Sequence, residues 1–182
     1  MNLFRVANLI KQDLNRFTPI DSFVAKLKCI LFVHSFHLVM LYRIGGLLAS
    51  LPFVGSLLRV LWEYLIRIVY ASDISLKSKI GGGLIIMHGH DIVIGSSVSI
   101  GQNCKILNGV TIGNKDTETI VNQQPTIGDG VVIGSGAKIL GDIIIGNDVV
   151  IGANSVVTTS FPSNVVVAGI PGKVIRTLNH AE

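Results

Sequence analysis

Aliphatic residues recur every six positions along most of the chain between Ile74 and Val157. A period of six matches neither the 3.6-residue period of an α-helix nor the two-residue alternation of a long strand. Short strands with regular corners explain it. Each hexad turns one aliphatic side chain inward and bends where Gly, Asn or Asp tolerates unusual backbone angles, as at Asn103, Asp129 and Asn147. Three hexads close one triangular coil of eighteen residues, and stacked coils bury a column that no single coil could bury. The fold class is therefore mainly β, a hexapeptide-repeat solenoid anchored by Ile74, Ile80, Ile86, Ile94, Ile100, Ile106, Ile112, Ile127, Ile133, Ile139, Ile145, Ile151 and Val157.

The chain has 182 residues and a mass of 19.5 kDa, which leaves room for one domain and an appendage. Residues 1–72 form an α-helical N-terminal region, 73–176 the solenoid and 177–182 a short tail. The charge divides in the same way. Residues 1–70 carry eight Lys or Arg against three acidic residues, whereas residues 71–182 carry seven against eight. Only the helical part could therefore favour an anionic surface.

In the helical part, Arg59, Glu63 and Arg67 follow at four-residue intervals and share one face of an amphipathic helix. Such helices pack against each other or a sister subunit, or lie on a membrane, so residues 1–70 are a candidate for peripheral membrane contact. The uncharged runs 29–42 and 44–58 are too short to span a bilayer, which takes about 20 residues. No signal peptide is evident, and we expect a cytoplasmic protein, with association at the inner face of the cytoplasmic membrane as an open alternative.

Composition excludes several classes of protein. Hydrophobic residues make up 49% of the chain, which excludes a disordered one. Cys29 and Cys104 are predicted to be free thiols, and Cys104 to be a small buried residue because Val98 and Val110 fill its hexad position elsewhere. The cysteines have no metal-ligand spacing, so no metal is expected. The basic residues are not interleaved with aromatic ones, so no nucleic-acid partner is expected.

The repeat IGSGAKILG at 133–141 resembles the left-handed parallel β-helix of the hexapeptide-repeat acyltransferases. More narrowly, residues 73–176 resemble the serine acetyltransferases and their shorter relatives in polysaccharide O-acetylation, whereas the helical part matches only in outline. This resemblance implies a left-handed winding, an O-acetyltransferase activity with acetyl-CoA as co-substrate, and no metal. It also implies a homotrimer, with a dimer of trimers as an open alternative.

The first interruption of the hexads, at 87–91, is two residues too long. The resemblance implies that His88 is the catalytic base and that Asp73, fifteen residues earlier, orients it. Such a pair suits the chemistry, because a neutral imidazole can take the hydroxyl proton while a carboxylate fixes its tautomer. Two alternatives stay open. His88 could be a corner residue satisfied by backbone groups, or it could form a metal pair with His90.

The second interruption is the polar segment 114–126, which should protrude from the solenoid. The resemblance implies that this loop helps to bind donor and acceptor, although a tolerated surface excursion would have the same pattern. Candidate positions for binding acetyl-CoA are, by the same resemblance, Asn114, Ser135 and Ala153. Lys138, Lys173 and Arg176 are candidate phosphate partners, with solvated surface charges as the alternative.

Candidate acceptor-binding residues are Met87, His90, Gln123 and Gln124. Three of these depart from the serine acetyltransferase pattern, in which an Asp stands at position 87 and an Arg-His pair at 123 and 124. Free serine carries two charges that a partly desolvated site must pair. We therefore expect a sugar hydroxyl in bacterial surface polysaccharide (exopolysaccharide, capsule or O-antigen) as acceptor, with serine O-acetylation in cysteine biosynthesis as the alternative. A catalytically inactive scaffold and an ice-binding solenoid are two other classes that would keep the hexads.

Overall fold

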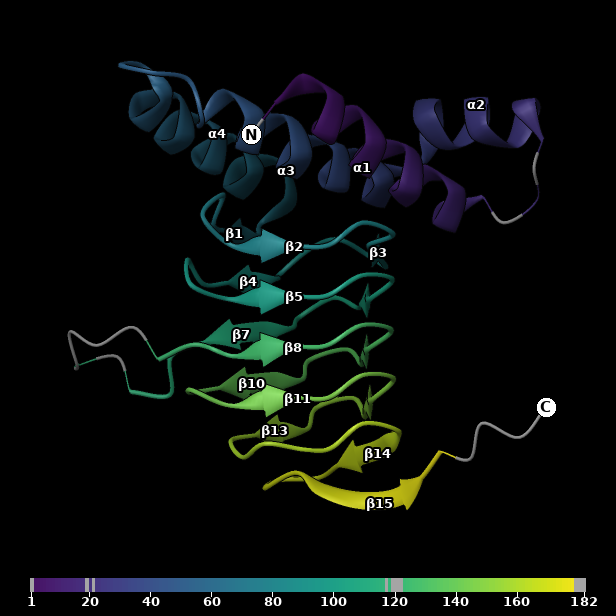
Figure 1. Cartoon of the computed structure of the whole chain (residues 1–182), viewed down its shortest axis with the longest axis vertical. Coiled ribbons are helices and arrows are strands. Elements are labelled where there is room, and N and C mark those ends of the chain that lie inside the picture. The colour runs from purple at the N-terminus through teal and green to yellow at the C-terminus, as the bar shows by residue number, and fades with distance from the viewer. Residues whose placement is uncertain (1, 19, 21, 117, 119–122, 179–182) are drawn as a thin grey trace.

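The computed structural model describes residues 2–18, 20, 22–116, 118 and 123–178, so the predicted tail lies largely outside the described residues. Helices occupy the N-terminal end and short strands the rest of the chain (Figure 1). The helices are α1 (Leu3–Phe17), α2 (Phe23–Phe32), α3 (His34–Leu48) and α4 (Gly55–Tyr70). The strands are β1 (Asp73–Ile74), β2 (Lys79–Ile80), β3 (Ile85–Ile86), β4 (Val93–Ile94), β5 (Ser99–Ile100), β6 (Lys105–Ile106), β7 (Thr111–Gly113), β8 (Thr126–Ile127), β9 (Val132–Ile133), β10 (Lys138–Leu140), β11 (Ile144–Ile145), β12 (Val150–Ile151), β13 (Val156–Val157), β14 (Val165–Ala168) and β15 (Lys173–Thr177).

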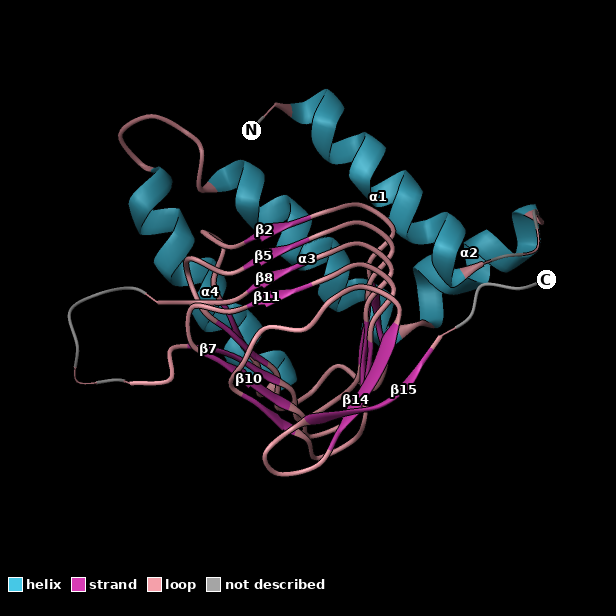
Figure 2. Ribbon diagram, turned by 60° about the horizontal axis from the view of Figure 1, so that its bottom comes forward, coloured by secondary structure: helices cyan, strands magenta, loops and turns pink. Residues whose placement is uncertain are grey.

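The strands form three sheets that make the sides of a triangular prism (Figure 2). Sheet A has the order β1-β4-β7-β10-β13, sheet B the order β11-β8-β5-β2, and sheet C the order β15-β14-β12-β9-β6-β3. The register aligns the anchoring residues, since Ile94 pairs with Ile112 and Ile139 with Val157. Pairing is parallel throughout except between β14 and β15, which are antiparallel. The predicted parallel β-helix behind an α-helical region is confirmed.

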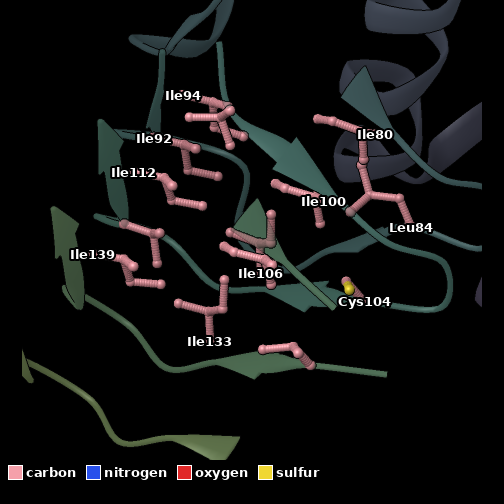
Figure 3. Close-up of a cluster of buried hydrophobic side chains, with 14 of the residues drawn as sticks. Ile80, Leu84, Ile92, Ile94, Ile100, Cys104, Ile106, Ile112, Ile133 and Ile139 are labelled. Atoms are coloured by element: carbon pink, nitrogen blue, oxygen red, sulfur yellow. The ribbon is translucent and has the colours of Figure 1, made fainter. Parts of the chain in front are cut away.

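The interior of the prism is a column of aliphatic side chains. Every anchoring residue predicted from the hexads is buried. Figure 3 shows Ile100, Ile106 and Ile112, which come from sheets B, C and A, among the side chains that fill this interior. Full burial of such a side chain stabilises the fold by about 1.5–3 kcal/mol. The stack therefore depends on all three hexads of a coil placing an aliphatic residue at the same depth.

The corners between sheets B and C are held by side chains that reach to the coil above. Asn103 is left-handed, with φ of 57° as expected, but Asp129 and Asn147 are not. The left-handed residue follows each of them, for example Asp148 with φ of 54°. Asp129 Oδ1 instead accepts the Gln102 N–H at 2.6 Å, and Asn147 Oδ1 accepts the Asp129 N–H at 2.9 Å. These short polar side chains thus satisfy corner N–H groups that no strand pairs.

The helices cover the first coil of the prism (Figure 1). A buried ion pair joins α1 and α3, with Arg43 Nε 2.9 Å from Asp13 Oδ2 and both side chains at most 2% exposed. Arg43 also donates to the carbonyls of Ile80 and Gly81, and the N–H of Leu84 donates to Asp13 Oδ1 at 2.8 Å. This network fastens the helices to the open end of the solenoid, whose backbone groups would otherwise lack partners.

Helix α4 is amphipathic, as predicted, and its polar face is turned toward the first coil. Glu63 Oε1 accepts the N–H of Leu76 at 2.8 Å, and Arg67 Nη2 lies 2.6 Å from Asp73 Oδ2. The apolar residues of the helix consequently lie on the outside, and the exposed ones are Leu57, Val60, Leu61, Tyr64, Leu65, Ile68 and Val69.

None of the described helices is by itself long and apolar enough to span a bilayer. Helices α2 and α3 satisfy length and composition together, but they are bent by 79° relative to each other.

Replacing Arg43 by Met should lower the free energy of unfolding by about 3–5 kcal/mol, because it leaves the Asp13 carboxylate buried without its countercharge. Urea denaturation at fixed protein concentration measures the loss. The matched control is Arg59→Met, which removes a partly exposed pair with Glu63 at 3.8 Å and should cost no more than about 1 kcal/mol. Equal losses in the two variants would contradict the role assigned to the buried pair.

Candidate functional site

A column of equivalent residues runs down the corner between sheets C and A. The N–H of Gly136 donates to Asn108 O at 2.9 Å, and that of Asn154 to Ser135 O at 2.8 Å. The column, from the first coil downward, is His90, Asn108, Ser135 and Ala153. Ser135 Oγ donates to Asn108 Oδ1 at 3.0 Å. The two predicted acetyl-CoA positions, Ser135 and Ala153, thus lie in adjacent coils at the same corner as His90.

The two extra residues of the first interruption lie directly above this column. Asp91 is left-handed, as are Gly109 and Asn154 at the equivalent positions, so the insertion comes before it. His88 is a second left-handed residue, with φ of 53°. Non-glycine residues in this region are uncommon and concentrate at functional sites. The exposed His88 is therefore held on a distorted corner that no later coil repeats.

Helix α3 fixes this corner from above. The N–H of Gly89 donates to Ser35 Oγ at 3.3 Å. A Cβ at position 89 would lie only 2.7 Å from Leu38 Cδ2, so any larger residue there would displace the Leu38 side chain where the corner meets the helix. Met87, on the other side of His88, is exposed, and its backbone N–H pairs with Ile106 O at 2.8 Å. The position of His88 thus depends on the helical region as well as on the repeat.

Asp73 begins the first strand of sheet A, next to the same corner. Its backbone N–H donates to Ile92 O at 2.8 Å, which places it one coil above the residues that follow His88. Its carboxylate is bound by Arg67, at 2.6 Å between Nη2 and Oδ2, with both side chains about half exposed. Among the described residues no hydrogen bond joins Asp73 to His88, and Asp73 Oδ1 accepts none. The predicted pairing of Asp73 with His88 stays a prediction.

Three other predicted residues lie at the corner between sheets A and B, where the chain leaves β7 and returns to β8. Asn114 Oδ1 is buried and has no hydrogen-bond partner among the described residues. Gln123 is exposed. Gln124 Oε1 accepts the N–H of Ser97 at 2.8 Å and lies over Gly95, where a Cβ would clash with it. Gln124 therefore caps a corner of its own chain. Residues 117 and 119–122 of the predicted loop lie outside the described part.

The three predicted phosphate partners have different surroundings. Lys138 is partly buried, and its Nζ donates to Gly109 O at 2.6 Å and to Thr111 Oγ1 at 3.0 Å. Two of its three donors are thus used within the chain. Lys173 and Arg176 are exposed on β15, at the bottom edge of sheet C. These two are better placed than Lys138 to meet an external anion.

One protomer therefore divides the predicted site between two corners. His88, His90, Ser135 and Ala153 lie where sheet C meets sheet A. The second group, Asn114, Gln123 and Gln124, lies where sheet A meets sheet B. A whole strand of sheet A separates the two groups in each coil (Figure 2).

The described residues provide neither a reactive cysteine nor a metal-binding cluster at these corners. Cys104 is buried as predicted, and burial raises the pKa of its thiol to about 11. Its Sγ donates to Gly128 O at 3.2 Å. A thiol with such a pKa is a poor nucleophile near neutral pH. No group of three or more His, Cys, Asp or Glu residues in the described part of the chain could hold a metal ion.

Comparison with known proteins identifies the family. The model "Bacterial transferase hexapeptide (six repeats)" matches residues 124–159. The chain is 32% identical over 181 residues to serine acetyltransferase from Buchnera aphidicola subsp. Schizaphis graminum, covering 99% of this chain and 69% of that protein. The chain belongs to the serine acetyltransferase family. It is 33% identical over 178 residues to serine acetyltransferase 2 of Arabidopsis thaliana, covering 97% of this chain. The structure of serine acetyltransferase from Brucella abortus in complex with coenzyme A matches with a TM-score of 0.86 at 28% identity, covering 97% of this chain and 70% of that one.

The expectation of a sugar acceptor in polysaccharide synthesis is wrong. The relatives that match nearly the whole of this chain are serine acetyltransferases, although the chain spans only 54% of the Arabidopsis protein. Substitutions at positions 87, 123 and 124 therefore do not by themselves identify the acceptor. Gln124, one of them, is bound to the backbone at Ser97, so its identity is explained by the corner that it caps.

Several residues around the site have no signal in the sequence. The sequence predicts only that Arg67 shares a helix face with Arg59 and Glu63. Ser35 and Leu38 lie more than fifty positions before Gly89, the corner residue that they contact. Asn108 could have been found, because it lies eighteen positions after His90 in the hexad count.

Arg67 is expected to act as a positioning residue for Asp73. Arg67→Met should lower kcat for acetyl transfer by about two- to fivefold, because an exposed ion pair contributes at most about 1 kcal/mol. Arg67→Lys should restore most of the rate, and Arg59→Met, two turns earlier on the same helix, should leave it unchanged. Steady-state kinetics of the three variants measure this. Equal rates in Arg67→Met and the parent protein would contradict it.

Proposed function

We propose that this protein transfers the acetyl group of acetyl-CoA to the hydroxyl of L-serine. The observation that carries the proposal is the inserted corner at His88, in a chain that matches serine acetyltransferases over nearly its whole length. In this family the His of the overlong hexad is the catalytic base, and here that histidine is exposed and held in a left-handed conformation.

His88 is the group that moves the proton. Neutral imidazole removes the hydroxyl proton of serine as its oxygen attacks the thioester carbonyl, because an alcohol with a pKa far above 7 is otherwise a poor nucleophile. The tetrahedral intermediate then expels the coenzyme A sulfur, which takes the proton back from the imidazolium. The acetyl group passes directly to serine, and no acyl-enzyme is needed.

Asp73 is proposed to orient His88 through Oδ1, while Arg67 binds Oδ2. A carboxylate on one ring nitrogen fixes the tautomer that leaves the other nitrogen free to accept a proton. Asp73 pairs with Val93, which follows the His88 corner, so the two residues lie next to the same corner, and this supports the arrangement.

Acetyl-CoA is proposed to run along the corner column that contains Ser135 and Ala153. The amides of its pantetheine arm can pair with corner backbone groups in the manner of an added strand. Asn114 lies at the other corner, so it would contact this ligand from a second copy. Its buried Oδ1 has no donor among the described residues, and an amide N–H of the ligand could supply one. Lys173 and Arg176 would then meet phosphate, with Lys138 contributing one remaining donor. An enzyme that uses acetyl-CoA is expected in the cytoplasm.

The acceptor is proposed to lie between His88, Met87 and His90 of one protomer and residues 123 and 124 of another. These groups occupy different corners of one prism, so a second copy must bring them together. We therefore propose a homotrimer with sites at the subunit boundaries. The apolar side of α4, which includes Leu57 and Leu61, is available for the same assembly. A pairing of two such trimers would give a hexamer.

His88→Ala should lower kcat for transfer to L-serine by about 10² to 10⁴, since a positioned general base contributes about that factor. The KM for serine should change little. Release of coenzyme A measures the rate. His37→Ala is the histidine control, because the His37 ring is hydrogen-bonded to the carbonyl of Ile30 within the helical region. The proposal fails if the parent protein shows no saturable transfer to serine. Wild-type rates in folded His88→Ala would instead remove His88 from the mechanism.

Sedimentation equilibrium should give three times the chain mass of 19.5 kDa, or six times if trimers pair. Mixing His88→Ala subunits with subunits whose 123–124 segment is changed to Ala-Ala should restore part of the activity, because some boundaries then combine two intact corners. A fully active monomer would contradict the shared site.

A further inference from the structure

A cavity of about 670 Å³ lies between the helices and the first two coils, on the side of sheet B. Its walls come from α1, the C-terminal half of α3, α4, and strands β2 and β5. In Figure 1 these helices lie above β2 and β5. Sites for small molecules usually enclose about 300–1,000 Å³. None of the residues proposed to bind acetyl-CoA or the acceptor lines this cavity, so a ligand here would occupy a second site.

Three exposed cations line different walls of the cavity. Arg5 comes from α1, whereas Lys77 and Lys79 come from the first coil. None of the three forms an ion pair with a described residue. No Asp or Glu is among the described residues that line the cavity. The potential in the cavity is therefore positive, and low-dielectric walls focus such a potential.

Two further arginines line the cavity, and both are already paired. Arg43 lies 2.9 Å from Asp13, and its Nη1 and Nη2 donate to backbone carbonyls of the first coil. Arg59 Nη1 lies 3.8 Å from Glu63 Oε2. The charge of an anion in the cavity would therefore be balanced mainly by Arg5 and the two lysines.

Apolar surface completes the lining of the cavity. Leu76 and Ile80 are buried residues of the first coil, and Leu9 of α1 is half-buried. The Tyr42 hydroxyl donates to Ser78 O at 2.8 Å, so this tyrosine offers mainly the apolar surface of its ring. A small inorganic ion would leave these groups in contact with water. The lining instead suits a ligand that joins an anionic group to an apolar body.

We propose that this cavity binds an organic phosphate monoester. The phosphate would lie between Arg5 and the two lysines, Lys77 and Lys79. The apolar part of the ligand would lie against Leu76 and Ile80. A phosphate monoester carries a charge of about −1.5 to −2 near pH 7, whereas a carboxylate carries a single charge. The guanidinium can bind phosphate oxygens through two parallel N–H donors, and the ammonium groups add further charged donors.

Such a ligand would connect α1 to the first coil. Asp13 of α1 already accepts the N–H of Leu84, so the ligand would add a second connection between the same two elements. A ligand that binds only the folded protein raises the melting temperature as its concentration rises. Binding is therefore measurable as stabilisation, without reference to acetyl transfer.

The probe for this site is 1-naphthyl phosphate, because it joins a phosphate monoester to a flat apolar ring system. Calorimetric titration of the full-length protein should show saturable binding, and the melting temperature should rise with probe concentration. 1-Naphthol and inorganic phosphate each lack one half of the probe and should bind at least about tenfold more weakly. No saturable binding of the probe, or equally tight binding of 1-naphthol, would overturn the proposal.

Two variants test the walls of the cavity separately. Lys77→Gln combined with Lys79→Gln, and Arg5→Gln alone, should each lower the affinity for the probe by about tenfold or more, because each removes charged donors to the phosphate. These side chains are exposed, so the melting temperature without the probe should stay that of the parent protein. Lys11→Gln combined with Lys28→Gln is the matched control, since it removes two exposed charges of the helices outside the cavity. An equal loss of affinity in this control would show non-specific attraction and contradict the proposal.

A third variant distinguishes the cavity from the proposed acetyl-CoA site. Lys173→Gln combined with Arg176→Gln removes the proposed phosphate partners of acetyl-CoA and should leave binding of the probe unchanged. If this variant loses binding while the cavity variants retain it, the probe occupies the acetyl-CoA site and the cavity proposal is wrong. The outcome does not depend on whether L-serine is the acceptor.

Discussion

The stacking of coils in strict register is the constraint on which the rest of the molecule depends. Each strand is only two to five residues long, so its hydrogen bonds and its one or two inward side chains are worth little alone. Register places Ile94 over Ile112 and Ile139 over Val157, which joins these small contributions into one core. A corner may lengthen without disturbing the core, provided that the next aliphatic residue returns to the column.

That freedom explains why the candidate site lies at corners. The His88 insertion changes neither the strand before it nor the strand after it, yet it projects an ionisable side chain from a distorted backbone. Distortion of this kind persists only when the surroundings hold it. Here Ser35 and Leu38 of α3 do so, and α3 is itself fastened by the Arg43–Asp13 pair. The helical region is thus part of the site's support as well as the cover of the solenoid.

Polar residues near the site serve the fold in ways that local patterns hide. Gln124 is a predicted acceptor contact, and its Oε1 also caps the corner at Ser97. Lys138 is a predicted phosphate partner, and its Nζ also donates to Gly109 O of the coil above. In a solenoid every corner leaves backbone groups unpaired, so side chains of the next coil are recruited to satisfy them. A substitution at such a position does not identify the substrate.

The sequence by itself determined the coil, because a six-residue aliphatic period has one simple physical explanation and Ile100, Ile106 and Ile112 fill the core as expected. It also marked the His88 corner as an interruption of that period. It did not determine where Arg67 would bind, which way α4 would face, or that the predicted site residues fall on two corners. Those features depend on how separate elements pack against each other. Arg67 and Glu63 of α4 meet Asp73 and Leu76 of the first coil, and only the packed structure brings these groups within hydrogen-bonding distance.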